Sequence, residues 1–180
     1  MEARNIFSNI SPIDHRYSLS ESHVFNSMSD CISEQAAIIS CACAEIALVK
    51  AHLSLRGQLD AAIERTLDTV AETIDPSAVY AEEEKTKHNI RALVNVLKTM
   101  VPETVAPLVH LGATSVDILD TALSVRVRDC VQTVLLPLLK ELLAVLCGLA
   151  DRESETPEVG RTHGQHAVPI TFGFALAEYV

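Results

Sequence analysis

The long tract between Asp117 and Asp151 constrains the fold of this chain more than any other feature. Within it an apolar residue recurs every three or four positions, a spacing that places the side chains along one stripe of an α-helix. A helix of this length is typical of one rod of a helical bundle, and Pro137 is expected to bend it. The apolar positions are Leu119, Leu123, Val127, Val131, Leu135, Leu138, Leu142, Val145 and Leu149.

Shorter segments with the same periodicity predict further helices over residues 27–55, 59–74, 77–100 and, after a loop over 155–164, near 169–180. Gly57 and the pair Asp75-Pro76 supply stop signals between the first three. Aromatic residues make up only 4% of the chain and Trp is absent, whereas sheets favour aromatic and β-branched residues. The sequence therefore predicts an all-α fold.

A segment with two prolines and a glycine, VPETVAPLVHLGATS, separates the first helices from the long tract. We expect the domain boundary there, near residue 111. The prediction is an N-terminal helical domain over residues 1–111, followed over 112–180 by the first long helices of a central helical bundle. The last amphipathic run reaches Val180 without a capping signal, so this second domain is expected to be truncated.

Composition excludes several classes of partner. Lys and Arg number 14 against 24 Asp and Glu, so the net charge of −10 makes binding to a nucleic-acid backbone an unlikely main role. Residues 131–150 approach the length of a membrane span, but Lys140 and Glu141 would each cost about 2.5–3.5 kcal/mol at the centre of a bilayer. We therefore expect a buried bundle helix and no membrane partner.

The cysteines and the N-terminus bear on localisation. Five cysteines are an odd number, and they lie in apolar runs without the short paired spacing of a zinc site or a disulfide framework. No apolar segment of a secretory signal follows Met1. These features predict reduced core cysteines in a cytoplasmic protein.

A first polar cluster, Gly112-Ala113-Thr114-Ser115, directly precedes the long tract. Its ordinary interpretation is a helix cap, in which Thr114 or Ser115 accepts from first-turn N–H groups and Asp117 complements the helix dipole. The alternative is that the same hydroxyls and N–H groups hold a carboxylate or a phosphate.

A second cluster runs from Gly160 to His166 with the sequence GRTHGQH. It could simply shape a polar loop, and a metal site is disfavoured because no Cys and no HExxH arrangement accompanies the two histidines. The glycines on either side of Thr162 and His163 suggest instead a backbone that approaches a ligand closely. Histidine is also suited to proton transfer near neutral pH.

A third cluster, Lys87-His88-Asn89, lies within the predicted helix 77–100. A solitary histidine on a helix is commonly solvated or part of a cap. None of the three clusters indicates a function when it is taken alone.

Taken in order, the segments SPIDHRY, KHN, HLGATSVDILDTA and GRTHGQHAVPITFG resemble the fumarase/aspartase superfamily of β-elimination lyases. Within it they are most similar to the adenylosuccinate lyase family. The resemblance extends from Ser11 to Phe172, and four motifs in the same order are far more specific than any one of them.

The resemblance implies roles for individual residues. Arg16 and Tyr17 would bind a nucleotide phosphate, while Lys87 and His88 would lie at the substrate, with His88 orienting the group that undergoes elimination. Asn89, which replaces the Asp that commonly follows this histidine in the family, would also bind substrate. The remaining implied residues are Thr114 and Ser115 for a succinyl carboxylate, Thr162 and Gln165 for substrate binding, and His163 as general acid.

The resemblance also implies a reaction. The family eliminates fumarate from adenylosuccinate to give AMP, and from the related succinyl-aminoimidazole-carboxamide ribotide, in purine nucleotide biosynthesis. It uses no metal or other cofactor, and its active sites are assembled from three subunits of a homotetramer. The family's catalytic base is a serine on a Gly-Ser-rich loop that does not occur among these 180 residues, so we expect the chain to be inactive alone.

Two alternatives remain. A 3-carboxy-cis,cis-muconate cycloisomerase shares the GATS and DTA pattern but usually lacks the Thr-His pair and the Arg-Tyr pair present here. A non-catalytic helical interaction protein would need none of Arg16, Thr114, Ser115 and His163, since a scaffold does not depend on them.

Overall fold

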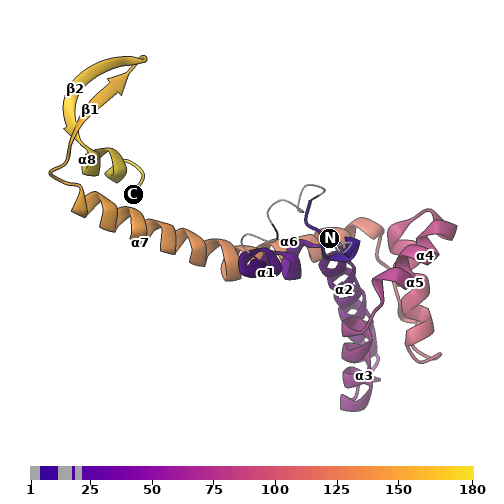
Figure 1. The fold of residues 1–180 in the computed structure, drawn as a ribbon. Helices are drawn as coiled ribbons and strands as arrows, with labels where there is room; N and C mark the ends of the chain where they lie inside the picture. Colours follow the sequence, from indigo (N-terminus) through magenta and orange to yellow (C-terminus); the bar gives the residue numbers. More distant parts are fainter. Residues whose placement is uncertain (1–4, 12–17, 19–21) are drawn as a thin grey trace. The chain divides into compact units, whose positions relative to one another are not determined.

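The computed structural model describes residues 5–11, 18 and 22–180 of the protein (Figure 1). The chain divides into two compact units, residues 1–130 and residues 131–180. The first contains the 3₁₀ helices η1 (Ile6–Ser8) and η3 (Ala106–Leu108) and the helices α1 (Ser22–Ile32), α2 (Glu34–Leu55), α3 (Ala61–Glu72), α4 (Pro76–Thr86), α5 (Asn89–Met100) and α6 (Ser115–Cys130). The second contains a π-helical turn, η4 (Val131–Leu135), then α7 (Leu136–Arg152), β1 (Pro157–Thr162), β2 (Gln165–Thr171) and α8 (Phe172–Ala177).

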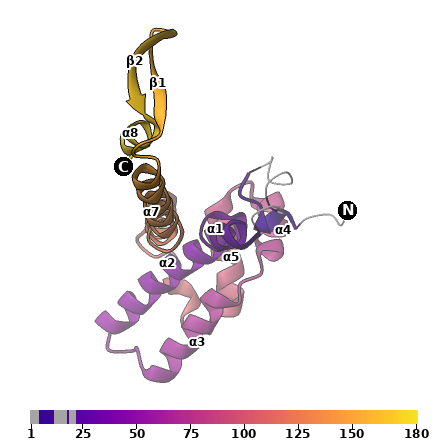
Figure 2. The same ribbon diagram turned by 60° about the vertical axis from the view of Figure 1, so that its left-hand side comes forward.

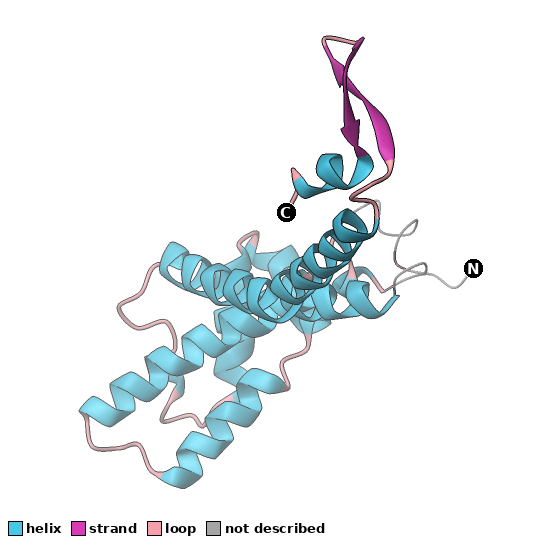
Figure 3. Ribbon diagram, turned by 90° about the vertical axis from the view of Figure 1, so that its left-hand side faces the viewer, coloured by secondary structure: helices cyan, strands magenta, loops and turns pink. Residues whose placement is uncertain are grey.

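Helices account for almost all of the regular structure, which confirms the predicted all-α class. In the described part of the chain the only strands are β1 and β2, drawn in magenta in Figure 3.

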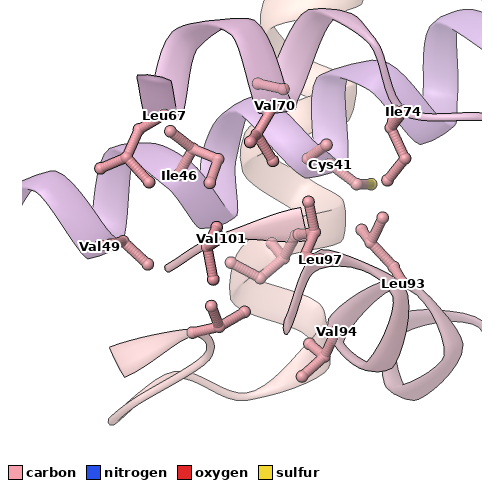
Figure 4. Packing of buried hydrophobic residues seen from close by; sticks show 14 of the residues in the cluster. Cys41, Ile46, Val49, Leu67, Val70, Ile74, Leu93, Val94, Leu97 and Val101 are labelled. Carbon is pink, nitrogen blue, oxygen red and sulfur yellow. The ribbon is translucent and has the colours of Figure 1, made fainter. Parts of the chain in front are cut away.

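The core of the first unit forms around α2, which packs against α1, α3, α5 and α6. Figures 1 and 2 both show α3 beside α2, joined to it by a short turn. Val49 of α2, Leu67 of α3 and Leu97 of α5 are among the largest fully buried side chains. Figure 4 shows them among the apolar side chains that α2, α3 and α5 direct toward one another.

Two predicted helices of this unit are each divided in the structure. The run expected over 27–55 begins earlier, at Ser22, and is interrupted at Ser33, whose hydroxyl accepts from the N–H of Ala36 at 3.2 Å and so caps α2. The run expected over 77–100 ends at Lys87, which has a φ of 52°, and restarts as α5. Periodicity did not reveal this break because the left-handed position carries no glycine.

The long predicted helix over 117–152 is confirmed, and its irregularity lies near Pro137. The π-helical turn at 131–135 directly precedes α7. A proline lacks an N–H, and its ring collides with the carbonyl four residues earlier, here that of Thr133. A wider π turn at this position accommodates the proline without ending the helix.

The second unit corrects two predictions. The loop expected over 155–164 is wrong, because residues 157–171 form an antiparallel hairpin. The helix expected near 169–180 is present but shorter, as α8 over 172–177. The backbone N–H of Phe172 donates to Thr156 O at 2.8 Å, and that of Gly173 donates to Glu153 O at 2.9 Å. These bonds hold the hairpin base and α8 against the end of α7.

Burial in the second unit also differs from expectation. No residue of α7 is buried within this chain, although the sequence predicted a buried bundle helix. Cysteine burial differs from expectation in both units: all five cysteines are free, and Cys43 of α2 and Cys147 of α7 are exposed and so do not lie in the core.

Two helical runs of the described chain, 22–55 and 115–152, are long and apolar enough to cross a membrane by length and composition. Core helices of soluble proteins meet the same criterion. In the first run 44% of the apolar window is buried, compared with 6% in the second. The absence of a membrane partner and the domain boundary near residue 111 stay predictions.

We expect Leu97→Ala to lower the free energy of unfolding by about 2–5 kcal/mol, because it leaves a cavity where the side chain is fully buried. The matched control is Leu55→Ala, at a leucine that is 88% exposed, which should change stability by less than about 0.5 kcal/mol. Urea denaturation followed by circular dichroism measures both. Equal effects of the two substitutions would contradict the core assignment.

Candidate functional site

The cluster Lys87-His88-Asn89 forms the junction between α4 and α5. Lys87 ends α4 in the left-handed conformation, and its amine pairs with Glu84 at 3.1 Å. His88 is the N-cap of α5, where its Nδ1 accepts from the backbone N–H of Arg91 at 3.3 Å. The capping interpretation of His88 is therefore correct, but it leaves the second ring nitrogen available.

That second nitrogen faces Ser115 at the start of α6. His88 Nε2 lies 3.5 Å from Ser115 Oγ, at the long end of hydrogen-bonding distance. Because Nδ1 acts as an acceptor, a neutral His88 ring carries its proton on Nε2 and donates toward the hydroxyl. Two of the residues singled out in the sequence, 27 positions apart, thus meet in the structure.

Thr114 and Asp117 form the cap of α6. The backbone N–H of Thr114 donates to Asp117 Oδ2 at 2.9 Å, which is the reciprocal half of a capping box. Asp117 therefore serves the helix end. The N–H of Asp117 donates to Thr114 O at 3.1 Å, whereas the N–H groups of Ser115 and Val116, at the start of α6, precede any carbonyl that could accept them within the helix.

His88 and Ser115 open onto a cavity of about 410 Å³ within the first unit. Its lining contains two histidines, two cationic side chains and no carboxylate, although the chain has a net charge of −10. Such a lining attracts an anion. The lining residues are His88, Arg91, Val94, Lys98, Val109, His110 and Ser115.

His110 is a site residue that the sequence analysis did not single out. It has a φ of 65°, and its Nδ1 lies 2.6 Å from Oε1 of Glu45, which is fully buried in α2. Burial raises the pKa of Glu45, while the hydrogen bond and charge of His110 and the charge of Lys98 act in the opposite direction. Glu45 could have been noticed as a lone carboxylate inside the apolar run ACACAEIALV.

The turn that carries His110 is tied to α2 a second time. His52 Nε2 lies 2.9 Å from the carbonyl oxygen of Leu111, to which it donates. Glu45 and His52, two turns apart on α2, therefore fix the backbone turn that closes one side of the cavity.

Lys87 and Asn89 do not line this cavity. Asn89 Oδ1 accepts from the N–H of Ile90 at 2.7 Å, and the Asn89 side chain belongs to a smaller, separate hollow beside Tyr80. Roles for Lys87 and Asn89 in substrate binding stay predictions. Arg16 and Tyr17 lie outside the described residues.

Thr162, His163 and Gln165 belong to the second unit, at the tip of the hairpin. Thr162 pairs with Gln165, and the two residues between them, His163 and Gly164, have φ angles of 50° and 71°. Positive φ at both central positions defines a type I′ turn, in which glycine at the second position is favoured. All of these side chains are exposed.

The hairpin also accounts for Gly160. It lies at an irregularity in the pairing, and a Cβ there would come within 2.7 Å of the carbonyl oxygen of Val168. The close approach that the glycines suggested is thus to the neighbouring strand.

Among the described residues, no group of three or more His, Cys, Asp or Glu side chains is placed to hold a metal ion. The candidate residues of the two units are hydrogen-bond donors, cationic side chains and imidazoles. This set suits anion binding and proton transfer.

Comparison with known proteins gives a family match over nearly the whole chain. A family model described as "Lyase" matches residues 15–180. Adenylosuccinate lyase of Methanothermobacter thermautotrophicus is 34% identical over 172 residues, which are 93% of this chain and 36% of that protein. Adenylosuccinate lyase of Archaeoglobus fulgidus is 36% identical over 168 residues, 93% of this chain and 35% of that protein.

Solved structures of lyases and related enzymes are also similar to this chain. The fumarate lyase from Mesorhizobium sp. BNC1 superposes with a TM-score of 0.71 at 31% identity, over 84% of this chain and 36% of that one. The 3-carboxy-cis,cis-muconate lactonizing enzyme from Pseudomonas putida gives 0.72 at 29% identity, over 84% and 35%. The chain spans about a third of the length of the relatives it matches.

The positive φ of His163 predicts which substitutions the hairpin turn tolerates at this position. We expect His163→Asn to preserve the hairpin, because Asn tolerates positive φ, whereas His163→Val should destabilise it by about 1–2 kcal/mol. Cross-strand nuclear Overhauser effects between Arg161 and His166 report on the pairing. A Val variant with wild-type pairing would contradict the type I′ assignment.

Proposed function

We propose, from the premise that this chain belongs to the lyase family of the fumarase/aspartase superfamily, that it supplies part of the active site of an adenylosuccinate lyase. The proposed reaction eliminates fumarate from adenylosuccinate to give AMP, and from the succinyl-aminoimidazole-carboxamide ribotide by the same chemistry. The identity to two adenylosuccinate lyases over 93% of the chain supports this choice.

One observation carries the proposal: His88 and Ser115 meet at an anion-attracting cavity. A succinyl carboxylate in this cavity would accept from the Ser115 hydroxyl and from free N–H groups at the start of α6. Thr114 precedes Ser115 but does not line the cavity, and we assign its hydroxyl to the same carboxylate by the family resemblance. Arg91 and Lys98 would balance its charge. Donors fixed before the substrate arrives stabilise the additional negative charge that develops during elimination.

The elimination needs two proton transfers. A base removes the proton β to the departing nitrogen, the carbanion delocalises into the adjacent carboxylate, and an acid protonates the nitrogen as it leaves. We assign the acid to His163, supported by Thr162 and Gln165, and the phosphate contact to Arg16 and Tyr17. The base would be a serine from outside these residues, so the isolated chain is proposed to be inactive.

We also propose that the protein works as a homotetramer in the cytoplasm, without a cofactor. The exposed apolar surface of α7 supports self-association, since large apolar patches mark interaction surfaces. Its exposed members include Leu139, Leu142, Leu143 and Val145.

The rival enzyme is a 3-carboxy-cis,cis-muconate cycloisomerase, and similarity to the Pseudomonas putida lactonizing enzyme is the observation in its favour. Both substrates carry carboxylates, so the cavity alone does not separate them. A nucleotide phosphate is present only in adenylosuccinate. Competition between AMP and substrate therefore distinguishes the two enzymes.

We expect the chain, joined to the remaining two thirds of the Archaeoglobus fulgidus relative, to release fumarate from adenylosuccinate. In this chimera His163→Asn should lower kcat by about 10²–10⁴-fold with a smaller change in KM, because it removes a transferable proton while keeping the turn. Arg16→Ala should mainly raise KM, since a phosphate contact is shared by ground and transition states. Near-normal kcat in a folded His163→Asn chimera would remove the assignment of the acid.

We expect the 19.5 kDa chain to self-associate through α7 and the double variant Leu142→Glu/Val145→Glu to reduce its mass in solution. Two charges on the apolar surface would have to be buried in an assembly, which is costly. Leu55→Glu, on an exposed leucine of α2, is the control and should leave the mass unchanged. A wild-type chain that is monomeric by light scattering at high concentration would contradict this prediction.

A further inference from the structure

Glu45 is the most unusual charged residue of the first unit. It lies in the middle of α2 between apolar neighbours, and none of its surface is exposed. Its Oε1 is hydrogen-bonded to His110 Nδ1 at 2.6 Å, while its Oε2 has no hydrogen-bond partner among the described residues. A buried carboxylate with half of its acceptors unused is costly, so it calls for a reason other than packing.

Stability alone does not supply that reason. Replacing a buried ion pair by apolar residues of similar volume is often neutral or stabilising. Apolar residues such as Ile46 and Val49 occupy the neighbouring core positions of α2, so an apolar side chain at position 45 would suit this face of the helix.

The partner of Glu45 provides a better explanation. His110 is 24% exposed and lines the same cavity as His88 and Ser115. An ionised Glu45 can only accept a hydrogen bond, and in that state the short contact places the His110 proton on Nδ1. Nε2 is then the ring nitrogen that remains for a ligand in the cavity.

We propose that Glu45 is a positioning residue, which keeps His110 Nδ1 protonated and orients the ring, so that a second proton taken up at Nε2 is donated to an anionic group of the ligand. The proposal rests on the proposed function for the ligand class, a carboxylate. The backbone of His110 has a positive φ, which few residues other than glycine adopt. The Glu45 carboxylate bonds the His110 ring, and His52 bonds the carbonyl oxygen of the next residue, Leu111. A neutral ring with its proton on Nδ1 has only a lone pair at Nε2, so the anionic ligand binds the doubly protonated ring, whose positive charge is balanced by the Glu45 carboxylate.

The direct test is the tautomer of His110, measured by ¹⁵N NMR of the imidazoles in the 180-residue chain, with His110→Gln used to assign the signal. We expect wild-type His110 to keep its proton on Nδ1 in the free chain and to carry a proton on both ring nitrogens when fumarate is bound. In Glu45→Gln the amide can accept or donate, so both tautomers should appear. Glu45→Asp keeps the charge but withdraws it by one methylene, and should also lose the fixed tautomer.

Val49→Ala is the matched control. It lies one turn along α2, is fully buried and should lower stability without touching His110. A tautomer change in Val49→Ala similar to that in Glu45→Gln would mean that general loosening, and not Glu45, controls His110. An unchanged tautomer in Glu45→Gln, or a wild-type ring protonated only on Nε2, would overturn the proposal.

Fumarate titration of the same samples tests the ligand step. We expect Glu45→Gln to weaken fumarate binding about 10- to 100-fold, as for the loss of a charge-assisted hydrogen bond, and Val49→Ala to leave it unchanged. Equal affinity in wild type and Glu45→Gln would overturn the positioning role. If fumarate does not perturb His88 or Ser115 in the wild type, the proposed carboxylate site fails, while the tautomer measurement still decides the role of Glu45.

Discussion

The apolar packing of α2 against α3, α5 and α6 is the constraint on which the candidate site depends. Val49, Leu67 and Leu97 are fully buried where α2, α3 and α5 meet, and Ile118 and Ala122 of α6 belong to the same buried cluster. The positions of α5 and α6 are therefore fixed by close contacts. Fixed helices have fixed ends, and His88 and Ser115 lie at the starts of two of them. The meeting of their side chains is thus a consequence of core packing.

Electrostatics then give the cavity its character. The chain as a whole is strongly acidic, yet the cavity gathers Arg91, Lys98 and two histidines. The carboxylate that is hydrogen-bonded to this group, that of Glu45, contacts His110 and is buried away from solvent. The cavity can therefore attract an anion although the net charge of the protein is negative.

Helical periodicity predicted the class of fold and most of the helices, because it reflects burial of one face. It did not predict the break at Lys87, where a non-glycine residue adopts a left-handed conformation. It also missed the hairpin, whose His163-Gly164 turn is a weaker signal than Asn-Gly and whose strands are largely exposed and so lack a strong alternation.

The candidate site likewise contains residues that the sequence predicted and residues that only the structure revealed. His88 and Ser115 were found from the sequence because they lie in recognisable motifs, and the geometry brings them together. His110 lies in one of those motifs but was not singled out, and Glu45 lies in none. Their contact joins residues 65 positions apart and depends on the turn after η3, which no local pattern specifies.

We propose that the cavity between the starts of α5 and α6 binds a carboxylate, and a crystal structure of the chain soaked with fumarate would test this. We expect a fumarate carboxylate within about 3 Å of Ser115 Oγ and of a first-turn N–H of α6, with His110 Nε2 or His88 Nε2 as a further donor. Fumarate bound elsewhere in the chain, with this cavity holding only solvent, would contradict it.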